Sequence, residues 1–433
     1  MSMATKTNDN QPSLKHNLSL FDAVSINIGA IIGAGIFVVT GIVAGLAGSA
    51  MIISLILAAM VSLFTALTFA ELSAKYPEEG GAYEFARRLI SPFTGFIAGW
   101  MWIISNTLVG AAVALGFGHY LNVLIPGIPI KAIAFSVIVV FSILNVLGAK
   151  TSATFNNILV IAKVAILLLL VILGIFHINP TNLTPFTPFK PGVLFGAYFI
   201  FFAFSGFARI TLLSEEVKDA HRNVPKAILL SLLISTIIYI AVGIVAVGLV
   251  GSVKLADSGS PLTEASSAIG ISAVYQIVSI GGIIATASVL LTTILGVSRL
   301  SFAMSREKDL PLFLEKLDPR FGTPYLAIVI PGIIMVLLIF VSNLTQIVAA
   351  STLASLIYYG IGNYSALKLN TKDRLYPRAV PLIGLLFCAA LAVIVLFKSP
   401  EAWLIAVVIF IIGLLYYLLI RGRTIIKNTD GIS

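Results

Sequence analysis

Twelve long apolar segments, separated by short polar stretches, make up most of this 433-residue chain. A bilayer core of about 30 Å is crossed by roughly 20 helical residues, so each segment is long enough for one membrane-spanning helix. Only 10% of the residues are charged and the mean hydropathy is +1.06, which a soluble fold could not accommodate. The sequence therefore predicts an all-α polytopic membrane protein with 12 transmembrane helices.

Lysine and arginine residues gather in alternate loops. If the N-terminus is cytoplasmic, 21 of the 27 Lys and Arg residues lie on the cytoplasmic side and four lie outside. This asymmetry predicts a multi-pass integral protein of the cell membrane with both termini in the cytoplasm. It also accounts for the net charge of +9, so the charge does not indicate a nucleic-acid partner. Residues 1–20 lack the apolar core of a signal peptide and are expected to remain as a cytoplasmic tail.

The first apolar segment contains a glycine-rich run from Gly29 to Ile36, with three glycines in seven residues. Each glycine weakens a helix by about 1 kcal/mol relative to alanine, and at membrane depth no water is present to bind a loosened backbone. Two interpretations are open. Gly29 and Gly33 have the spacing of a close helix contact, whereas an unwound turn would present its amides and carbonyls to a ligand.

A second apolar segment, expected to be one helix over residues 192–214, shows the same irregularity. Its middle places Gly206 between aromatic residues and Arg209 at membrane depth. Interrupted segments at corresponding positions of two halves indicate the binding site of a secondary transporter, which favours the unwound interpretation of the first run.

The motifs around these segments resemble those of the amino acid, polyamine and organocation (APC) transporter superfamily. The similarity lies in Gly29-Ala-Ile-Ile-Gly-Ala-Gly-Ile-Phe37, Phe69-Ala-Glu-Leu-Ser-Ala-Lys-Tyr-Pro77 with Gly80-Gly-Ala-Tyr83, Phe201-Phe-Ala-Phe-Ser-Gly-Phe207, and Glu215-Glu-Val-Lys218 with Arg222-Asn-Val-Pro225.

This resemblance implies a leucine-transporter-like 5+5 inverted repeat with broken helices 1 and 6, followed by two C-terminal helices. The corresponding parts are a cytoplasmic tail (1–20), a first five-helix repeat (21–178), an external loop (179–191), a second, inverted repeat (192–369), helices 11 and 12 (370–422) and a cytoplasmic tail (423–433).

The resemblance also implies a substrate site at the two breaks. The amides of Gly33, Ala34 and Gly35, at the positive end of the outer half-helix, are expected to bind the carboxylate of an amino acid. The carbonyls near Phe204 and Ser205 are expected to accept from its ammonium group. The complete set of predicted substrate-binding residues is Ile32, Gly33, Ala34, Gly35, Ile36, Phe204, Ser205, Gly206 and Phe207, with Phe204 or Phe207 as a lid.

Lys163 interrupts the fifth apolar segment, where a lysine costs several kcal/mol unless it is solvated, paired or deprotonated. Such a lysine is a candidate proton carrier. It matches the position at which a lysine of APC members replaces a sodium ion, and that match implies the carbonyls of Gly29 and Ile32 and the hydroxyl of Thr286 or Ser288 as partners. A static ammonium that ties the fifth helix to the first is the alternative.

Arg209 and Glu71 are candidate gate residues. Arg209 keeps its charge and cannot carry the proton, so it is expected to pair with backbone carbonyls or with an acid such as Glu71 or Glu215. The alternatives are that Arg209 extends to the cytoplasmic face and that Glu71 anchors a helix.

The expected function is secondary active transport of a neutral amino acid, coupled to protons through Lys163, by alternating access. Ala208 stands where cationic amino acid carriers commonly have an acid, which argues against a cationic substrate. An amino acid exchanger with Lys163 as a fixed charge is the alternative. The sequence has no phosphate-binding glycine loop, only Cys388 as a thiol, and few ionisable residues within the helices, so a pump, a cofactor or metal site, and an enzyme are not expected.

Overall fold

A computed structural model describes residues 18–78, 80–148 and 153–429. Residues 1–17 of the expected N-terminal tail and 430–433 of the expected C-terminal tail lie outside this range. The described residues form helices and connecting turns without a named strand, and one isolated parallel bridge joins Leu18 to Val217. The longer helices are α1 (Leu20–Ile31), α2 (Thr40–Ala47), α3 (Met51–Lys75), α4 (Ala82–Leu89), α5 (Pro92–Leu124), α6 (Ile130–Val146), α7 (Ala153–Gly174), α8 (Pro191–Phe204), α9 (Ala220–Asp257), α10 (Pro261–Ser267), α11 (Ser272–Arg306), α12 (Tyr325–Val341), α13 (Leu344–Leu367), α14 (Ala379–Ile394) and α15 (Pro400–Thr429).

Eight stretches of the described chain are long and apolar enough to cross a membrane, and three shorter apolar helices accompany them. The first stretch, Leu20–Lys75, runs through α1, α2 and α3. Large apolar side chains such as Ile161, Ile333, Leu386 and Leu404 are exposed on the outer helices, as a lipid environment requires. The chain is therefore an all-helical polytopic membrane protein.

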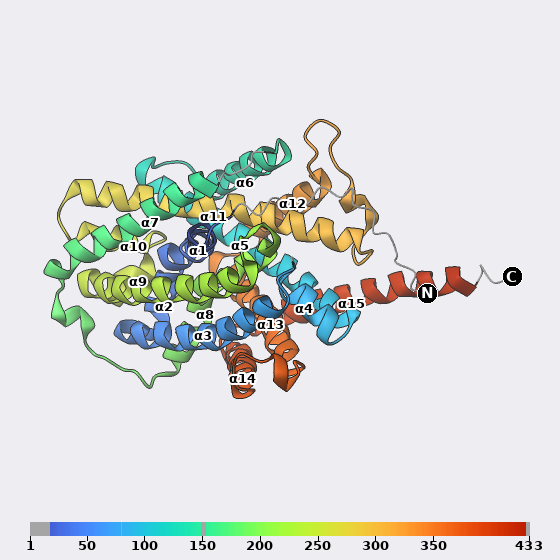
Figure 1. The fold of residues 1–433 in the computed structure, drawn as a ribbon. Helices are drawn as coiled ribbons and strands as arrows, with labels where there is room; N and C mark the ends of the chain where they lie inside the picture. Colours follow the sequence, from blue (N-terminus) through green and yellow to red (C-terminus); the bar gives the residue numbers. More distant parts are fainter. Residues whose placement is uncertain (1–17, 79, 149–152, 430–433) are drawn as a thin grey trace.

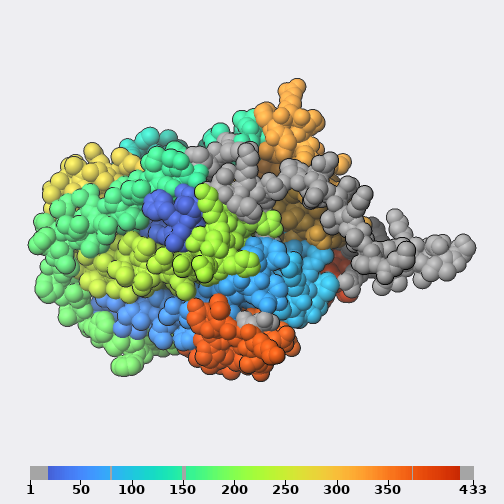
Figure 2. Space-filling view, in the orientation of Figure 1, coloured from blue at the N-terminus to red at the C-terminus, as the bar shows by residue number. Residues whose placement is uncertain are grey.

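Two groups of helices pack within the bundle. In the first, α1, α2, α3 and α8 contact one another or meet on α9; in the second, α5, α6, α11 and α12 pack together. Figure 1 shows the long helices side by side, with α14 at one margin and α15 extending toward the C-terminus. In the space-filling view, α1 is visible only as a small blue patch between α7 and α9 (Figure 2).

Helix α1 stops at Ile31 inside the bundle. Ile32 is extended, with φ −77° and ψ 92°, and its amide closes the helix on the Ile28 carbonyl at 2.8 Å. The chain resumes in a π-helical turn, η1 (Gly35–Val39), which leads into α2. The glycine-rich run is therefore interrupted at Ile32 and Gly33, and a Cβ atom on Gly33 would lie 2.4 Å from a methyl group of Val289. The run thus combines a break with close packing, and the binding of a ligand by its backbone stays a prediction.

Helix α8 stops at Phe204, so the segment expected over 192–214 is interrupted, as expected of a broken helix. Ser205 donates from its backbone and its hydroxyl to the Phe202 carbonyl, and the chain continues in the 3₁₀ turn η5 (Arg209–Leu212). Two competing hydrogen bonds to one carbonyl end the α-helical pattern locally.

The two breaks touch each other through glycines. A Cβ atom on Gly206 would lie 2.4 Å from the carbonyl carbon of Ala30, and one on Gly35 would lie 2.3 Å from the Cα atom of Ala203. Only glycine fits such a backbone contact, because the opposing atoms belong to the main chain and cannot rotate away.

Substitution of Gly206 by alanine should lower the stability of the purified protein. We expect a loss of about 1–3 kcal/mol, because the added methyl group forces the two breaks apart. Thermal unfolding in detergent, followed by size-exclusion chromatography, measures this. Gly360→Ala is the matched control, since a Cβ atom there meets only Leu385 at 3.7 Å. Equal melting temperatures of the two variants would contradict the backbone contact.

Candidate functional site

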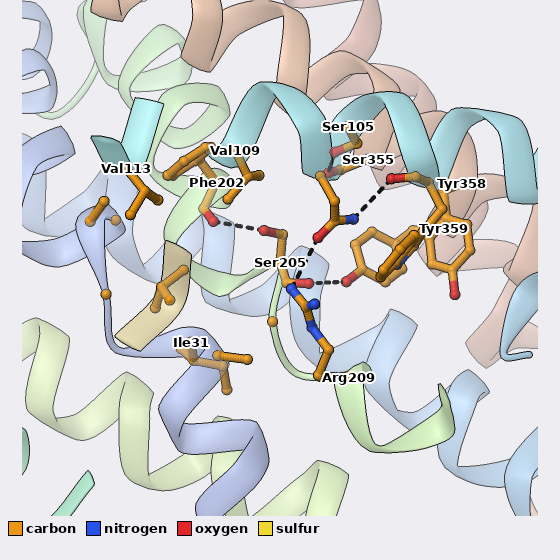
Figure 3. Close-up of a pocket in the computed structure, with 18 residues that line it drawn as sticks. Ile31, Ser105, Val109, Val113, Phe202, Ser205, Arg209, Ser355, Tyr358 and Tyr359 are labelled. Carbon is orange, nitrogen blue, oxygen red and sulfur yellow. Dashed lines mark hydrogen bonds between the residues drawn. The ribbon is translucent and has the colours of Figure 1, made fainter. Parts of the chain in front are cut away.

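A cavity of about 30 Å³ lies where the two breaks meet α5, α11 and α13 (Figure 3). Its walls include backbone of the broken segments and the polar side chains of α5 and α13. It is lined by Ala30, Ile31, Gly33, Ala34, Gly35, Trp102, Ser105, Asn106, Val109, Val113, Phe202, Ser205, Gly206, Arg209, Val289, Ser355, Tyr358 and Tyr359. None of these residues is acidic, so the cavity offers no side-chain carboxylate to a cationic group.

Five of the residues expected at a substrate site line this cavity: Gly33, Ala34, Gly35, Ser205 and Gly206. Ile32, Ile36, Phe204 and Phe207 are fully buried and are not among its lining residues.

The aromatic rings expected as a lid pack elsewhere. Phe207 stacks on Tyr359 with ring centroids 4.8 Å apart, and Phe204 meets Tyr239 edge-on at 5.2 Å. In this conformation neither ring lines the cavity, which corrects the lid expectation: both rings fill space around the α8 break.

Tyrosine hydroxyls bind the carbonyls that the breaks expose. Tyr239 of α9 donates to Ile31 at 2.7 Å and to Ala203 at 3.2 Å, so one hydroxyl reaches both broken helices. Tyr359 of α13 donates to the Ser205 carbonyl (Figure 3). Sequence reasoning missed both residues. The available signal was a phenolic hydroxyl in an apolar helix, which has to find an acceptor within the protein.

Lys163 lies fully buried on α7. Its Nζ donates to the Gly29 carbonyl at 3.1 Å and to the Ser288 hydroxyl at 2.8 Å, so it joins α7 to α1 and α11. Thr286 instead donates to the Gly282 carbonyl of its own helix at 2.7 Å, and no bond from Lys163 to Ile32 is present among the described residues. The structure thus brings to the amine one of the two expected carbonyls, that of Gly29, and one of the two alternative hydroxyls, that of Ser288.

A larger cavity of about 290 Å³ lies beside the first, toward the end of the bundle that carries α4. Gly29 and Ser288, the two partners of Lys163, line it, and so does the exposed Arg299. Ala30 and Arg209 line both cavities. The amine of Lys163 therefore lies behind the wall of a vestibule, and Arg209 stands between that vestibule and the smaller cavity.

The expected pairing of Arg209 with Glu71 is not present among the described residues. Arg209 donates from Nη2 to the Asn106 amide oxygen at 3.0 Å and lies 5.4 Å from the centre of the Trp102 ring. Glu71 accepts from the backbone amides of Leu375 and Tyr376, at 2.7 and 3.0 Å. Glu71 thus anchors the segment before α14, in agreement with the anchor alternative for this residue and not with a pairing to Arg209.

An ionic cluster joins α4 to the segment after α11 at the vestibule end. Arg87 pairs with Glu307 at 2.7 Å, and Tyr83 donates to Asp309 at 2.8 Å. Burial, reinforced by the Asp309 carboxylate, raises the pKa of Tyr83 above its usual value, so the hydroxyl remains a donor. Tyr83 also lines the larger cavity, which places this cluster at the vestibule wall.

The helices and the site together define a polytopic membrane transporter: two broken helices expose backbone groups to a polar cavity enclosed by apolar helices. A family model described as amino acid permease matches residues 18–420, and the chain belongs to this family, within the APC superfamily. The chain is 32% identical to the branched-chain amino acid permease BcaP of Bacillus subtilis (strain 168), over 87% of this chain and 88% of that protein.

Other relatives are named for different substrates. The chain is 33% identical to the methylthioribose transporter of Bacillus subtilis (strain 168), over 96% of this chain and 95% of that protein. It is 30% identical to the vacuolar cationic amino acid transporter 4 of Arabidopsis thaliana, over 80% of this chain and 62% of that protein. The family relation alone therefore does not specify the solute.

Tyr239→Phe should destabilise the described conformation and slow solute uptake. The variant leaves the carbonyls of Ile31 and Ala203 without this donor, at a cost of about 1–3 kcal/mol. Thermal unfolding and initial uptake rates in proteoliposomes measure the two effects. Tyr275→Phe, which removes the hydroxyl of a half-buried tyrosine near the start of α11, is the control. Wild-type stability and uptake in Tyr239→Phe would show that the bridge between the breaks is dispensable.

Proposed function

We propose that this protein is a secondary active transporter that carries a neutral amino acid into the cytoplasm together with a proton, by alternating access. The observation that carries the proposal is the contact of Lys163 with Gly29 at the first break. The next residues of that same broken segment, Gly33 to Gly35, line the small cavity. A change at the amine is thus transmitted to the backbone that receives the solute.

The proposed topology has twelve spans in a leucine-transporter-like arrangement. The first repeat consists of α1 with α2, then α3, α5, α6 and α7. The second, inverted repeat consists of α8 with η5, then α9, α11, α12 and α13, and α14 and α15 follow. Both termini are cytoplasmic, as the distribution of Lys and Arg predicts. The larger cavity then faces the cytoplasm.

In the proposed binding mode, the amides of Gly33, Ala34 and Gly35 bind the solute carboxylate at the start of the outer half-helix. The carbonyls exposed at the breaks accept from the ammonium group. Those of Ile31, Ala203 and Ser205 already accept from tyrosine hydroxyls, so the ammonium group shares or replaces these hydrogen bonds. Substrate binding is thereby coupled to α9 and α13.

Helix packing supports a rocking motion. The group formed by α1, α2, α3, α8 and α9 is proposed to move against the group formed by α5, α6, α11 and α12. Lys163 on α7 bonds to α1 in the first group and to α11 in the second. A protonated amine makes charge-assisted hydrogen bonds to both oxygens, whereas a neutral amine loses the charge and gains an acceptor lone pair, so its protonation state biases the two positions of α1.

A neutral substrate is favoured by the charges at the site. The small cavity has no acidic lining residue, Ala208 lies at the break, and Arg209 is a lining residue, so a cationic side chain would meet only positive charge. Methylthioribose, the solute for which one relative is named, is also uncharged and should be tested for uptake beside the neutral amino acids.

Uptake into proteoliposomes tests the coupling. With an empty lumen and an inward proton gradient, the wild-type protein should concentrate a neutral amino acid, and Lys163→Gln should abolish the dependence on the gradient. An exchanger with Lys163 as a fixed charge would take up substrate only when the lumen already contains it.

Lys131→Gln is the matched control, because Lys131 is exposed and, among the described residues, donates only to the Phe340 carbonyl at 3.1 Å. Gradient-driven accumulation that persists in Lys163→Gln would contradict proton coupling through this residue. Absence of uptake of all twenty amino acids, with or without internal substrate, would contradict amino acid transport itself.

A further inference from the structure

The guanidinium group of Arg209 is held on two sides. Its Nη2 donates to the Oδ1 atom of Asn106 at 3.0 Å, and its carbon atom lies 5.4 Å from the centre of the Trp102 ring. Asn106 is itself fixed, because its Nδ2 donates to the Trp102 carbonyl at 2.9 Å. Arg209, which Figure 3 shows beside Ser205, lines the small cavity together with Asn106 and Trp102. The cation is therefore placed before any solute arrives.

The second terminal nitrogen of the guanidinium group, Nη1, lacks an acceptor among the described residues. Nη1 of Arg209 is buried and has no hydrogen-bond partner among the described residues. Glu216 lines the neighbouring vestibule, but its carboxylate pairs with Arg299 at 3.5 Å. A buried, charged donor without a partner is costly, and a solute with an oxygen acceptor would relieve that cost.

Gly296 of α11 provides the room in which Nη1 lies. A Cβ atom at this position would lie 2.7 Å from Nη1 and 3.2 Å from the Trp102 ring. The unpartnered nitrogen thus lies against bare backbone, in a space that a larger residue would close.

We propose that Arg209 is a substrate-binding residue that takes a side-chain oxygen of the transported amino acid, with a carboxylate or a carboxamide as the preferred group. This inference rests on the proposed transport of an amino acid. A carboxamide side chain narrows the neutral substrate class, whereas a carboxylate side chain extends that class to an acidic amino acid. A planar guanidinium fork matches a carboxylate or an amide oxygen better than an ammonium group does. Ser105 and Ser355, whose hydroxyl oxygens lie 2.6 Å apart, line the same cavity and add polar groups beside the fork.

The proposal has a consequence for selectivity. Amino acids with a short oxygen-bearing side chain, such as aspartate and asparagine, should bind better than leucine, which leaves Nη1 without a partner. Lysine should bind worst, because its ammonium group would face Arg209 without an acid in the lining of the small cavity.

Titration calorimetry on the purified full-length protein tests this with L-aspartate, L-asparagine, L-leucine and L-lysine. We expect the wild-type protein to bind aspartate or asparagine about tenfold or more tightly than leucine. Arg209→Gln should reduce that preference to about threefold or less and leave the leucine affinity nearly unchanged. Gly296→Ala, which keeps the charge but displaces it, should shift the preference in the same direction by a smaller factor.

Arg299→Gln is the matched control, because it removes a positive charge from the vestibule wall where the side chain is 54% exposed. It should retain the wild-type order of affinities.

Tightest binding of leucine by the wild-type protein overturns the proposal. Equal weakening of leucine and asparagine in Arg209→Gln also overturns it, because Arg209 would then hold the common carboxylate or only support the fold. Failure of the wild-type protein to bind any of these amino acids counts against the proposed function and this inference together, whereas leucine binding without a role for Arg209 counts against this inference alone.

Discussion

Backbone groups released inside an apolar bundle have to find hydrogen-bond partners without water, and the rest of this structure depends on how they do so. Helix α1 stops at Ile31 and α8 stops at Phe204, both surrounded by other helices. At this depth each unsatisfied group costs several kcal/mol. The Ile31 and Ala203 carbonyls share the Tyr239 hydroxyl, and the Ser205 carbonyl accepts from Tyr359. The breaks are stabilised because tyrosine hydroxyls on α9 and α13 donate hydrogen bonds to these carbonyls.

These tyrosines also connect the breaks to the neighbouring helices. A carbonyl oxygen has two lone pairs, so each one can accept from a tyrosine and from a second donor. A solute ammonium group at the same carbonyls would therefore compete with or join hydrogen bonds that hold α9 and α13. Binding energy at the breaks is then available to shift the helices that surround the cavity, which a transporter requires.

Much of this arrangement could be predicted from the sequence, because backbone breaks leave a compositional signal. Glycines at 29, 33 and 35 and at 206 marked both interruptions, and the lysine at 163 marked a polar contact at membrane depth. The contacts of Lys163 with Gly29 and Ser288 agree with the expected neighbours, and the proton role remains a prediction. The segment over 192–214 was expected to be broken, but the serine hydrogen bonds that end α8 at Phe204 could not be predicted from an apolar pattern.

Side-chain direction was the part that the sequence could not supply. Phe207 and Tyr359 are both aromatic residues in apolar segments, yet one fills space and the other lines the cavity. Arg209 and Glu71 carry opposite charges and were expected to pair. Instead, Arg209 donates to the Asn106 amide oxygen, and Glu71 accepts from backbone amides. Tertiary packing determines which partner is within reach, so charge complementarity alone was a poor guide.

Lys163 and Arg209 differ in whether they can release a proton, and this difference supports the separate roles proposed for them. Lys163 is an amine that can exist without its proton in an apolar setting, and its two partners are neutral oxygens. Arg209 cannot lose its charge, and it is placed by Asn106 and Trp102 with one nitrogen unpartnered. A group that titrates suits energy coupling, whereas a permanent charge suits recognition. Because Ala30, the residue after Gly29, lines both cavities, the two proposed functions would meet within one turn of the broken helix.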